Sequence, residues 1–179
     1  MPHVLNRRTM LWTILGVLGL RRRRSSVPSF AEVRYRRLKN TVAISLEKVA
    51  EVWRPAPFDA RCCSPASAGG RGAEVVLKGI LVRLPGPAGG AETLKAFCLT
   101  CPHEICQVDF IEDTELVRVE PVMKPDHPLL VCPCHFSVFD PLGDGARIAG
   151  PADRGLYRFR FEVEGDRVEI AEVEQEVLE

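Results

Sequence analysis

The sequence has no net charge, no internal repeat and no long apolar segment. Its 24 basic and 24 acidic side chains cancel to a formal charge of zero. The longest apolar run near a terminus, residues 9–20, is about half of the roughly 20 residues that cross a bilayer as a helix, which excludes a polytopic membrane protein. The apolar fraction of 46% is normal for a globular protein, so a disordered chain is excluded as well.

The zero net charge hides two segments of opposite sign. Residues 1–40 carry ten basic side chains and one acidic side chain, about nine positive charges, whereas residues 41–179 carry about nine negative charges. Such asymmetry is typical of a targeting or interaction segment attached to a folded domain. We therefore expect an N-terminal signal or membrane anchor at residues 1–24, a basic linker at residues 25–40 and a folded domain at residues 41–179.

The N-terminal segment resembles a twin-arginine export signal in part. Arg7 and Arg8 precede the modest apolar run, as in such signals. The run is followed by four arginines, residues 21–24, and not by a small-residue cleavage site. The segment is therefore expected to serve export or anchoring, or to bind along a membrane surface through its arginines. Nucleic-acid binding is disfavoured, because the acidic domain would repel phosphates.

Alternation of apolar and polar residues predicts an all-β domain. The clearest case is Leu156 to Ile170, where Gly165 and Asp166 interrupt the alternation as in an antiparallel hairpin. Glu74 to Arg83 is a second predicted strand, with Gly79 as a possible bulge. Shorter strands are predicted at residues 95–99, 116–122 and 128–131, one helical turn near residues 46–53, and loops at residues 64–72 and 85–90.

Two short motifs carry the chemistry. The first reads Cys-Pro-His-Glu-Ile-Cys at residues 101–106, and the second reads Cys-Pro-Cys-His-Phe-Ser-Val-Phe-Asp at residues 132–140. A C-x-H pair and a C-x-x-H pair on two loops are the ligand set of a Rieske two-iron, two-sulfur cluster, in which two His replace two Cys on one iron. A structural zinc site also uses Cys and His, but the long gap between the motifs and the C-x-H spacing fit zinc poorly.

Residues 41–179 resemble the Rieske iron–sulfur subunits of cytochrome bc complexes. The resemblance implies an antiparallel β sandwich with a two-loop cluster-binding subdomain at about residues 99–153, preceded by an N-terminal arm or membrane helix. It also implies the ligands of a 2Fe–2S cluster. These would be Cys101 and Cys132 on one iron, and His103 and His135 on the other.

The same resemblance implies a disulfide and a covering loop. Cys106 and Cys134 correspond to cysteines that join the two cluster loops in these subunits, and such a staple removes loop freedom worth a few kcal/mol. A persistent disulfide implies an oxidising compartment, which agrees with the export-like arm. Gly150 and Pro151 are similar to the proline loop that covers the cluster.

Four positions near the expected cluster bear on its properties. Glu104 stands where the family usually has Leu, and would place a carboxylate near the histidines, which favours the oxidised cluster. Ser137 matches a serine that donates a hydrogen bond to a bridging sulfide. Phe139 stands where higher-potential members have Tyr, so one potential-raising hydrogen bond is missing. Phe136 replaces a Gly beside His135 and narrows the approach to that histidine.

The implied activity is electron transfer from quinol to a cytochrome c-type haem. His135 would contact the quinol and accept its proton. The implied partners are a cytochrome b-type subunit, a haem subunit and the membrane, with the cluster domain on the periplasmic side. A phenylalanine similar to Phe136 appears in the Rieske subunit of arsenite oxidase-like molybdenum enzymes. An electron-relay subunit of such an oxidase is therefore an alternative, as is a stand-alone electron carrier.

The remaining cysteines and His127 have no partner motif. Cys98 falls in a predicted strand and is expected to be a small buried side chain. Cys62 and Cys63 are expected in a loop, where pairing between chains or a bond to Cys98 is conceivable. His127 is expected in solvent.

Overall fold

The structure, a computed structural model, describes residues 33–64, 72–87, 90–117 and 126–178. The predicted N-terminal signal or anchor at residues 1–24 lies outside these ranges, as does the first half of the predicted linker, residues 25–32. Within the described ranges no helix has the length and apolar character needed to span a membrane. All regular helices there are short 3₁₀ turns, and all strand pairs are antiparallel. The predicted all-β class is confirmed.

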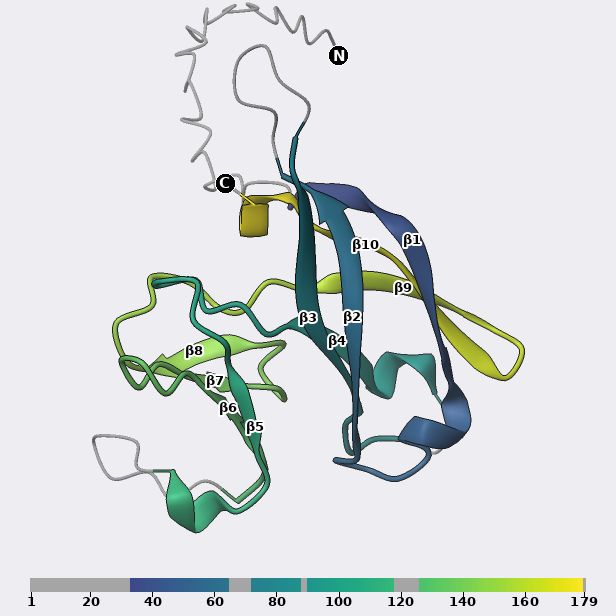
Figure 1. Ribbon diagram of the computed structural model, residues 1–179. Helices are drawn as coiled ribbons and strands as arrows, with labels where there is room; N and C mark the ends of the chain where they lie inside the picture. Colours follow the sequence, from purple (N-terminus) through teal and green to yellow (C-terminus); the bar gives the residue numbers. More distant parts are fainter. Residues whose placement is uncertain (1–32, 65–71, 88–89, 118–125, 179) are drawn as a thin grey trace, which may run out of the picture. The chain divides into compact units, whose positions relative to one another are not determined.

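Six longer strands form two three-stranded sheets (Figure 1). The first sheet has the order β1-β10-β9, and the second has the order β2-β3-β4. Their bounds are β1 Tyr35–Ser45, β2 Pro55–Cys63, β3 Glu74–Arg83, β4 Leu94–Cys98, β9 Phe159–Glu164 and β10 Arg167–Glu174. Between the two sheets lies a core whose members include Val168, Ile170 and Val173 from one sheet and Ala60, Leu77 and Leu81 from the other.

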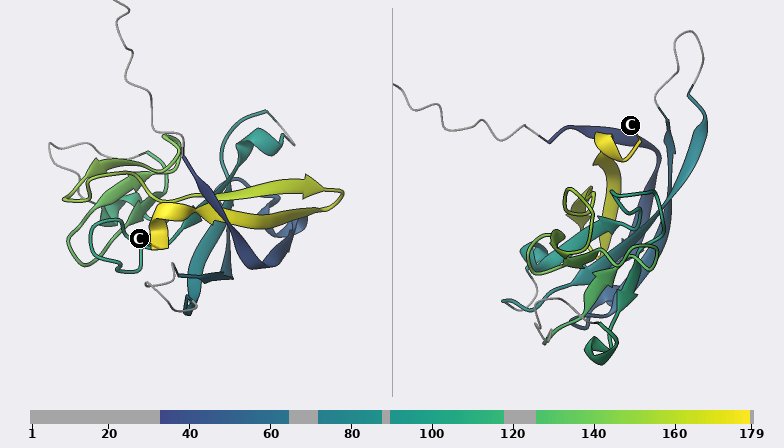
Figure 2. Two further views of the ribbon diagram at one scale, coloured as in Figure 1. Left: turned by 90° about the horizontal axis from the view of Figure 1, so that it is seen from above. Right: turned by 90° about the vertical axis from the view of Figure 1, so that its left-hand side faces the viewer.

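Four short strands form a third sheet with the order β5-β6-β7-β8. They are β5 Asp109–Ile111, β6 Leu129–Val131, β7 Val138–Asp140 and β8 Ala146–Ala149. Figure 1 shows these strands grouped together, and Figure 2 shows the same grouping from two further sides. In the chain they form an insertion between β4 and β9. Both ends of this insertion meet at one place, because Phe97 bridges to Arg158 and the N–H of Cys98 donates to the carbonyl of Tyr157 at 2.8 Å.

A second core joins the inserted sheet to β3 and β4. Its fully buried members include Val82 and Phe97 from the long strands and Leu130 and Phe139 from the short ones. The 3₁₀ turns are η1 Leu46–Val49, η2 Ala91–Thr93, η3 Thr114–Leu116 and η4 Gln175–Leu178. The predicted helical turn near residues 46–53 is therefore a 3₁₀ turn.

Four strand predictions are confirmed, and one detail is wrong. The hairpin broken at Gly165 is β9 and β10, and Glu74 to Arg83 is β3. The strands predicted at residues 95–99 and 128–131 are β4 and β6. Gly79 is not a bulge, since β3 pairs with β2 in unbroken register. Glycine is required there for space. A Cβ atom would meet the Phe58 ring and approach Phe159 Cε2 to 2.8 Å.

Three other segments differ from expectation. The first strand begins at Tyr35, within the predicted linker, where it pairs with β10 and places Arg37 opposite Glu172. Cys62 and Cys63 end β2 and are not in a loop. Residues 114–116, at the start of the predicted 116–122 strand, form η3, and residues 118–125 lie outside the described ranges.

Candidate metal centre

The first motif forms a tight loop between β4 and β5. The N–H of Cys101 donates to the carbonyl of Cys106 at 2.8 Å, and the N–H of Ile105 donates back to the carbonyl of Cys101 at 3.1 Å. The N–H of Val108 then donates to the carbonyl of Leu99 at 2.9 Å. These bonds close the loop on itself and fix the direction of its side chains.

The second motif forms an equivalent loop between β6 and β7. The N–H of Cys132 donates to the carbonyl of Ser137 at 2.8 Å, and the N–H of Phe136 donates to the carbonyl of Cys132 at 3.0 Å. The donor and acceptor positions, counted from the first cysteine, are those of the first loop. The two motifs therefore fold as a matched pair of hairpin loops.

The fifth residue of each loop has left-handed backbone. Ile105 has φ 51° and Phe136 has φ 58°. Glycine adopts this conformation at little cost, whereas other residues pay about 1–2 kcal/mol and a β-branched residue such as Ile105 is unusual there. Both side chains are exposed, Ile105 to 84% and Phe136 to 72%. Phe136, expected to narrow the approach to His135, is thus an exposed ring directly after that histidine, and Ile105 is its counterpart in the first loop.

A disulfide joins the two loops. Cys106 and Cys134 are bonded, with their Cα atoms 6.5 Å apart. This is the pair that the family resemblance implies. The remaining cysteines of the described ranges, Cys62, Cys63, Cys98, Cys101 and Cys132, are free thiols. Cys98 therefore has no bond to Cys62.

The free thiols of the two loops are buried together. Cys101 is 2% exposed and Cys132 is 1% exposed. Burial raises the pKa of the Cys101 thiol, the backbone N–H groups of His103 and Glu104 lower it, and the adjacent Cys132 thiol raises it. A pair of adjacent buried thiols with N–H groups directed at sulfur is suited to thiolate coordination, because those N–H groups stabilise negative charge on sulfur.

The two histidines lie together at the surface. The rings of His103 and His135 meet edge to face with centroids 4.9 Å apart. Glu104 completes this group, with a carboxylate oxygen 3.8 Å from Nδ1 of His135. Ligand atoms of all three residues lie within 4.8 Å of one another. The structure thus places the Glu104 carboxylate beside the histidines, as the sequence predicts.

A loop formed by residues 150–155, called here the Gly150 loop, packs on the second motif. The N–H of Ala152 donates to Oγ of the buried Ser137 at 3.1 Å. Gly150 has φ 85°, and a Cβ atom there would lie 2.7 Å from the backbone nitrogen of Ser137. Pro151 is exposed at the outer side. Since the Ser137 oxygen accepts a bond from this loop, its hydroxyl proton is left to donate elsewhere.

Phe139 is fully buried in β7. It belongs to the same core group as Cys101 and Cys132. Its ring therefore lies in the same core as the two thiols, and a tyrosine here would bring a hydroxyl into that core.

His127 is not in solvent, and the expectation for it is wrong. Its ring stacks on Trp53 at 5.6 Å and 13°. Its two nitrogens lie 2.7 Å from a carboxylate oxygen of Asp126 and 2.9 Å from one of Asp140. Burial lowers the pKa of His127, but the two carboxylates outweigh it and the net pKa is raised. The sequence signal is weak, since only Asp126 is adjacent in the chain.

Two free cysteines outside the motifs are buried in the core. Cys98 is fully buried, as expected, and burial raises the pKa of its thiol to about 11 while its contact with Thr100 lowers it. Cys62 is also fully buried, and burial raises the pKa of its thiol. Both side chains act as packing residues.

No protein-family model and no curated protein sequence matches the chain. The solved structures that are similar to it include two Rieske proteins. One is the plasma membrane Rieske protein PetC3 of Synechocystis PCC 6803, with 21% identity, coverage of 63% of this chain and 84% of that chain, and a TM-score of 0.35. The other is the soluble domain of Rieske protein II (soxF) of Sulfolobus acidocaldarius, with 17% identity, coverage of 79% and 78%, and a TM-score of 0.43.

Proposed function

We propose that this chain is a Rieske-type electron-transfer protein. Its 2Fe–2S cluster would be held by Cys101 and Cys132 on one iron and by His103 and His135 on the other. The observation that carries the proposal is the matched pair of loops, which presents two buried thiols and two exposed imidazoles from opposite motifs. More particularly, we propose a membrane-anchored subunit that oxidises quinol and reduces a cytochrome c-type haem.

The residues fit the cluster in number, type and placement. Two thiols and two imidazoles are the donor set of a Rieske centre, and the disulfide removes Cys106 and Cys134 from any competing four-cysteine site. A bound cluster of this type takes up and releases one electron at a higher potential than an all-cysteine cluster. The chain buries the sulfur ligands, exposes the imidazoles and places the Ser137 hydroxyl in the second loop.

The exposed imidazoles are where an electron donor would approach. The ring nitrogen of His135 that is not a ligand would accept a hydrogen bond from a quinol hydroxyl and then its proton. This requires that nitrogen to be deprotonated, because an imidazole bound to iron through one nitrogen carries its proton on the other, and coordination to iron lowers the pKa of that N–H. Support for this step comes from the exposure of His135, whose side chain is 46% accessible.

The membrane and partner assignments rest on the arm and the charge division. The arginine-rich residues 1–24 suit export or attachment to a membrane. The cluster domain would then lie on the outer, periplasmic side, where the Cys106–Cys134 disulfide persists. The proposed partners are a cytochrome b-type subunit and a haem subunit, whose basic surface would complement the acidic domain.

A second candidate is an electron relay within a molybdenum oxidase, with no quinol. Phe136 favours it, because an exposed ring directly after His135 narrows access to that histidine while offering apolar surface to a protein neighbour.

The test is purification of the full chain from native membranes, with partner identification and a quinol assay. The proposal predicts a co-purifying cytochrome b and cluster reduction by quinol that is lost in His135→Gln and retained in His127→Gln. The second variant is a matched control, because His127 lies outside both loops. A co-purifying molybdenum subunit, with no reduction by quinol, would establish the relay function instead.

A further inference from the structure

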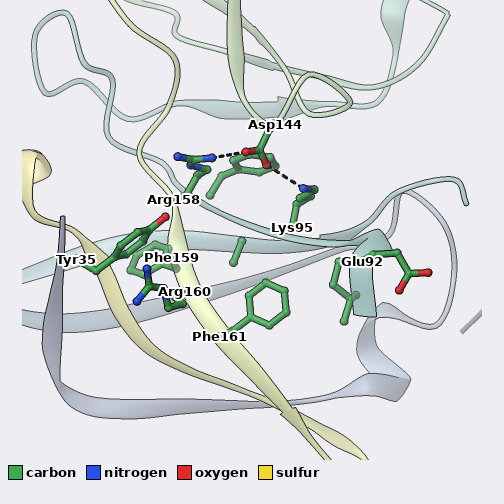
Figure 3. Close-up of a pocket in the computed structure, with 11 residues that line it drawn as sticks. Tyr35, Glu92, Lys95, Asp144, Arg158, Phe159, Arg160 and Phe161 are labelled. Carbon is green, nitrogen blue, oxygen red and sulfur yellow. Dashed lines mark hydrogen bonds and ion pairs between the residues drawn. The ribbon is translucent and has the colours of Figure 1, made fainter. Parts of the chain in front are cut away.

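A chain of charged side chains links the Gly150 loop to the long strands. Lys95 of β4 pairs with Asp144 at 2.9 Å, and Asp144 also pairs with Arg158. Figure 3 shows these three side chains converging. Arg158 Nε then donates to Glu174 at 2.6 Å. Glu174 also accepts a hydrogen bond from the guanidinium of Arg154, which belongs to the Gly150 loop.

Glu174 is the buried centre of this chain. Its side chain is 1% exposed, and a buried carboxylate is costly unless it is paired and hydrogen-bonded. It ends β10, so its place is fixed by the strand pairing with Tyr35 of β1. Arg154 and Arg158 together satisfy both of its oxygens. The buried Glu174, held in the sheet by strand pairing, therefore serves as an anchoring point for the Gly150 loop.

Arg154 is bound to this anchoring point in several ways. Besides Glu174, its guanidinium pairs with Glu176 and lies over the Tyr157 ring at 4.4 Å from the centroid. The next residue, Gly155, lies so close to the carbonyl of Gly145 that a Cβ atom there would be at 2.6 Å. One end of the Gly150 loop is thus held by Arg154, while the other end contacts the second motif through Ala152.

We propose that Arg154, held by the buried Glu174, is a positioning residue for the proposed cluster site. By fixing the Gly150 loop, it keeps the Ala152 N–H on Ser137 Oγ and so orients the Ser137 hydroxyl toward the cluster. Loss of this orientation removes a hydrogen-bond donor to the cluster and favours its oxidised form. The effect on the cluster rests on the proposed function, whereas the effect on the loop does not.

The test compares Arg154→Gln with Arg160→Gln in the full chain. Arg160 is a matched control, since it also joins a glutamate, Glu172 at 3.1 Å, and an aromatic ring, that of Tyr35 at 4.0 Å. Hydrogen exchange of the Ala152 amide is measured first, and the reduction potential of the loaded protein second. A conservative variant, Arg154→Lys, keeps the charge but loses the fork that reaches both glutamates.

In Arg154→Gln we expect the Ala152 amide to exchange about tenfold faster or more, because the bonds lost are between charged groups. We also expect the potential to fall, with Arg154→Lys intermediate and Arg160→Gln unchanged. If exchange of the Ala152 amide is unchanged in Arg154→Gln, or equally accelerated in Arg160→Gln, Arg154 does not hold the Gly150 loop and the proposal is wrong. Faster exchange of the Ala152 amide with an unchanged reduction potential would show that Arg154 holds the loop but does not affect the cluster. A wild-type protein without a cluster would instead refute the proposed function.

Discussion

Removal of the Cys106–Cys134 disulfide tests how the two loops are held. The bond closes a sequence separation of 28 residues. The loop-entropy relation for a cross-link of this length gives about 3.6 kcal/mol of stabilisation at 25 °C. Replacing both cysteines by Ala leaves little cavity, because Cys134 is exposed and Cys106 only half-buried. We therefore expect a loss of unfolding free energy close to the entropic value.

The assay is equilibrium unfolding in guanidinium chloride of iron-free protein, so that loss of a cluster does not add to the change. A domain of this size should show its midpoint lowered by roughly 1 M. Cys63→Ala is the control, since it removes a free, half-buried thiol outside the motifs. A loss below about 1 kcal/mol in the double variant, or an equal loss in the control, would refute the reasoning.

Three further predictions concern charge and hydrogen bonding. Phe139→Tyr should raise the reduction potential, because a hydroxyl in the core that contains the thiols can donate a hydrogen bond to sulfur. An unchanged potential in a redox titration would count against this. Glu104→Gln should also raise the reduction potential, because it removes a negative charge beside His135. The increase should be small, because water and salt screen a side chain that is 61% exposed. A lower potential in this variant would contradict the prediction. His127→Gln should destabilise the fold more at pH 5.5 than at pH 8.5 in urea unfolding. The folded pKa of His127 is raised above its usual 6.5, so its stabilisation is complete below that pH and disappears as pH rises through the folded pKa; equal losses would contradict this.

Periodicity predicts some strands and misses others. The β9–β10 hairpin follows from its alternation and its Gly-Asp turn. In contrast, β2 is not predicted although its side chains alternate between buried and exposed, because it begins with Pro55-Ala56-Pro57, whose prolines argue against a central strand. The prolines are tolerated there because β2 is an edge strand of its sheet. Of the four short strands of the inserted sheet, β6 alone is predicted, because strands of three or four residues are too short to show a period.

The candidate site is predicted from the sequence better than its surroundings. The two motifs indicate the four ligands, because each ligand lies within a few positions of another, and the family resemblance implies the disulfide. The ion pairs of Glu174 join residues 16 to 20 apart in the chain, and the stacking of His127 on Trp53 joins more distant segments still. Such contacts depend on how the sheets pack, which local sequence does not express.

The central claim is that two imidazoles and two thiolates from these loops bind one 2Fe–2S cluster. Its most direct test is pulsed electron paramagnetic resonance of the reduced protein, which detects nitrogen atoms bonded to iron. The account predicts couplings from two histidine nitrogens, with one lost in His103→Cys, one lost in His135→Cys and both kept in His127→Gln. A paramagnetic cluster without nitrogen coupling, or a protein that binds zinc and no iron, would contradict it.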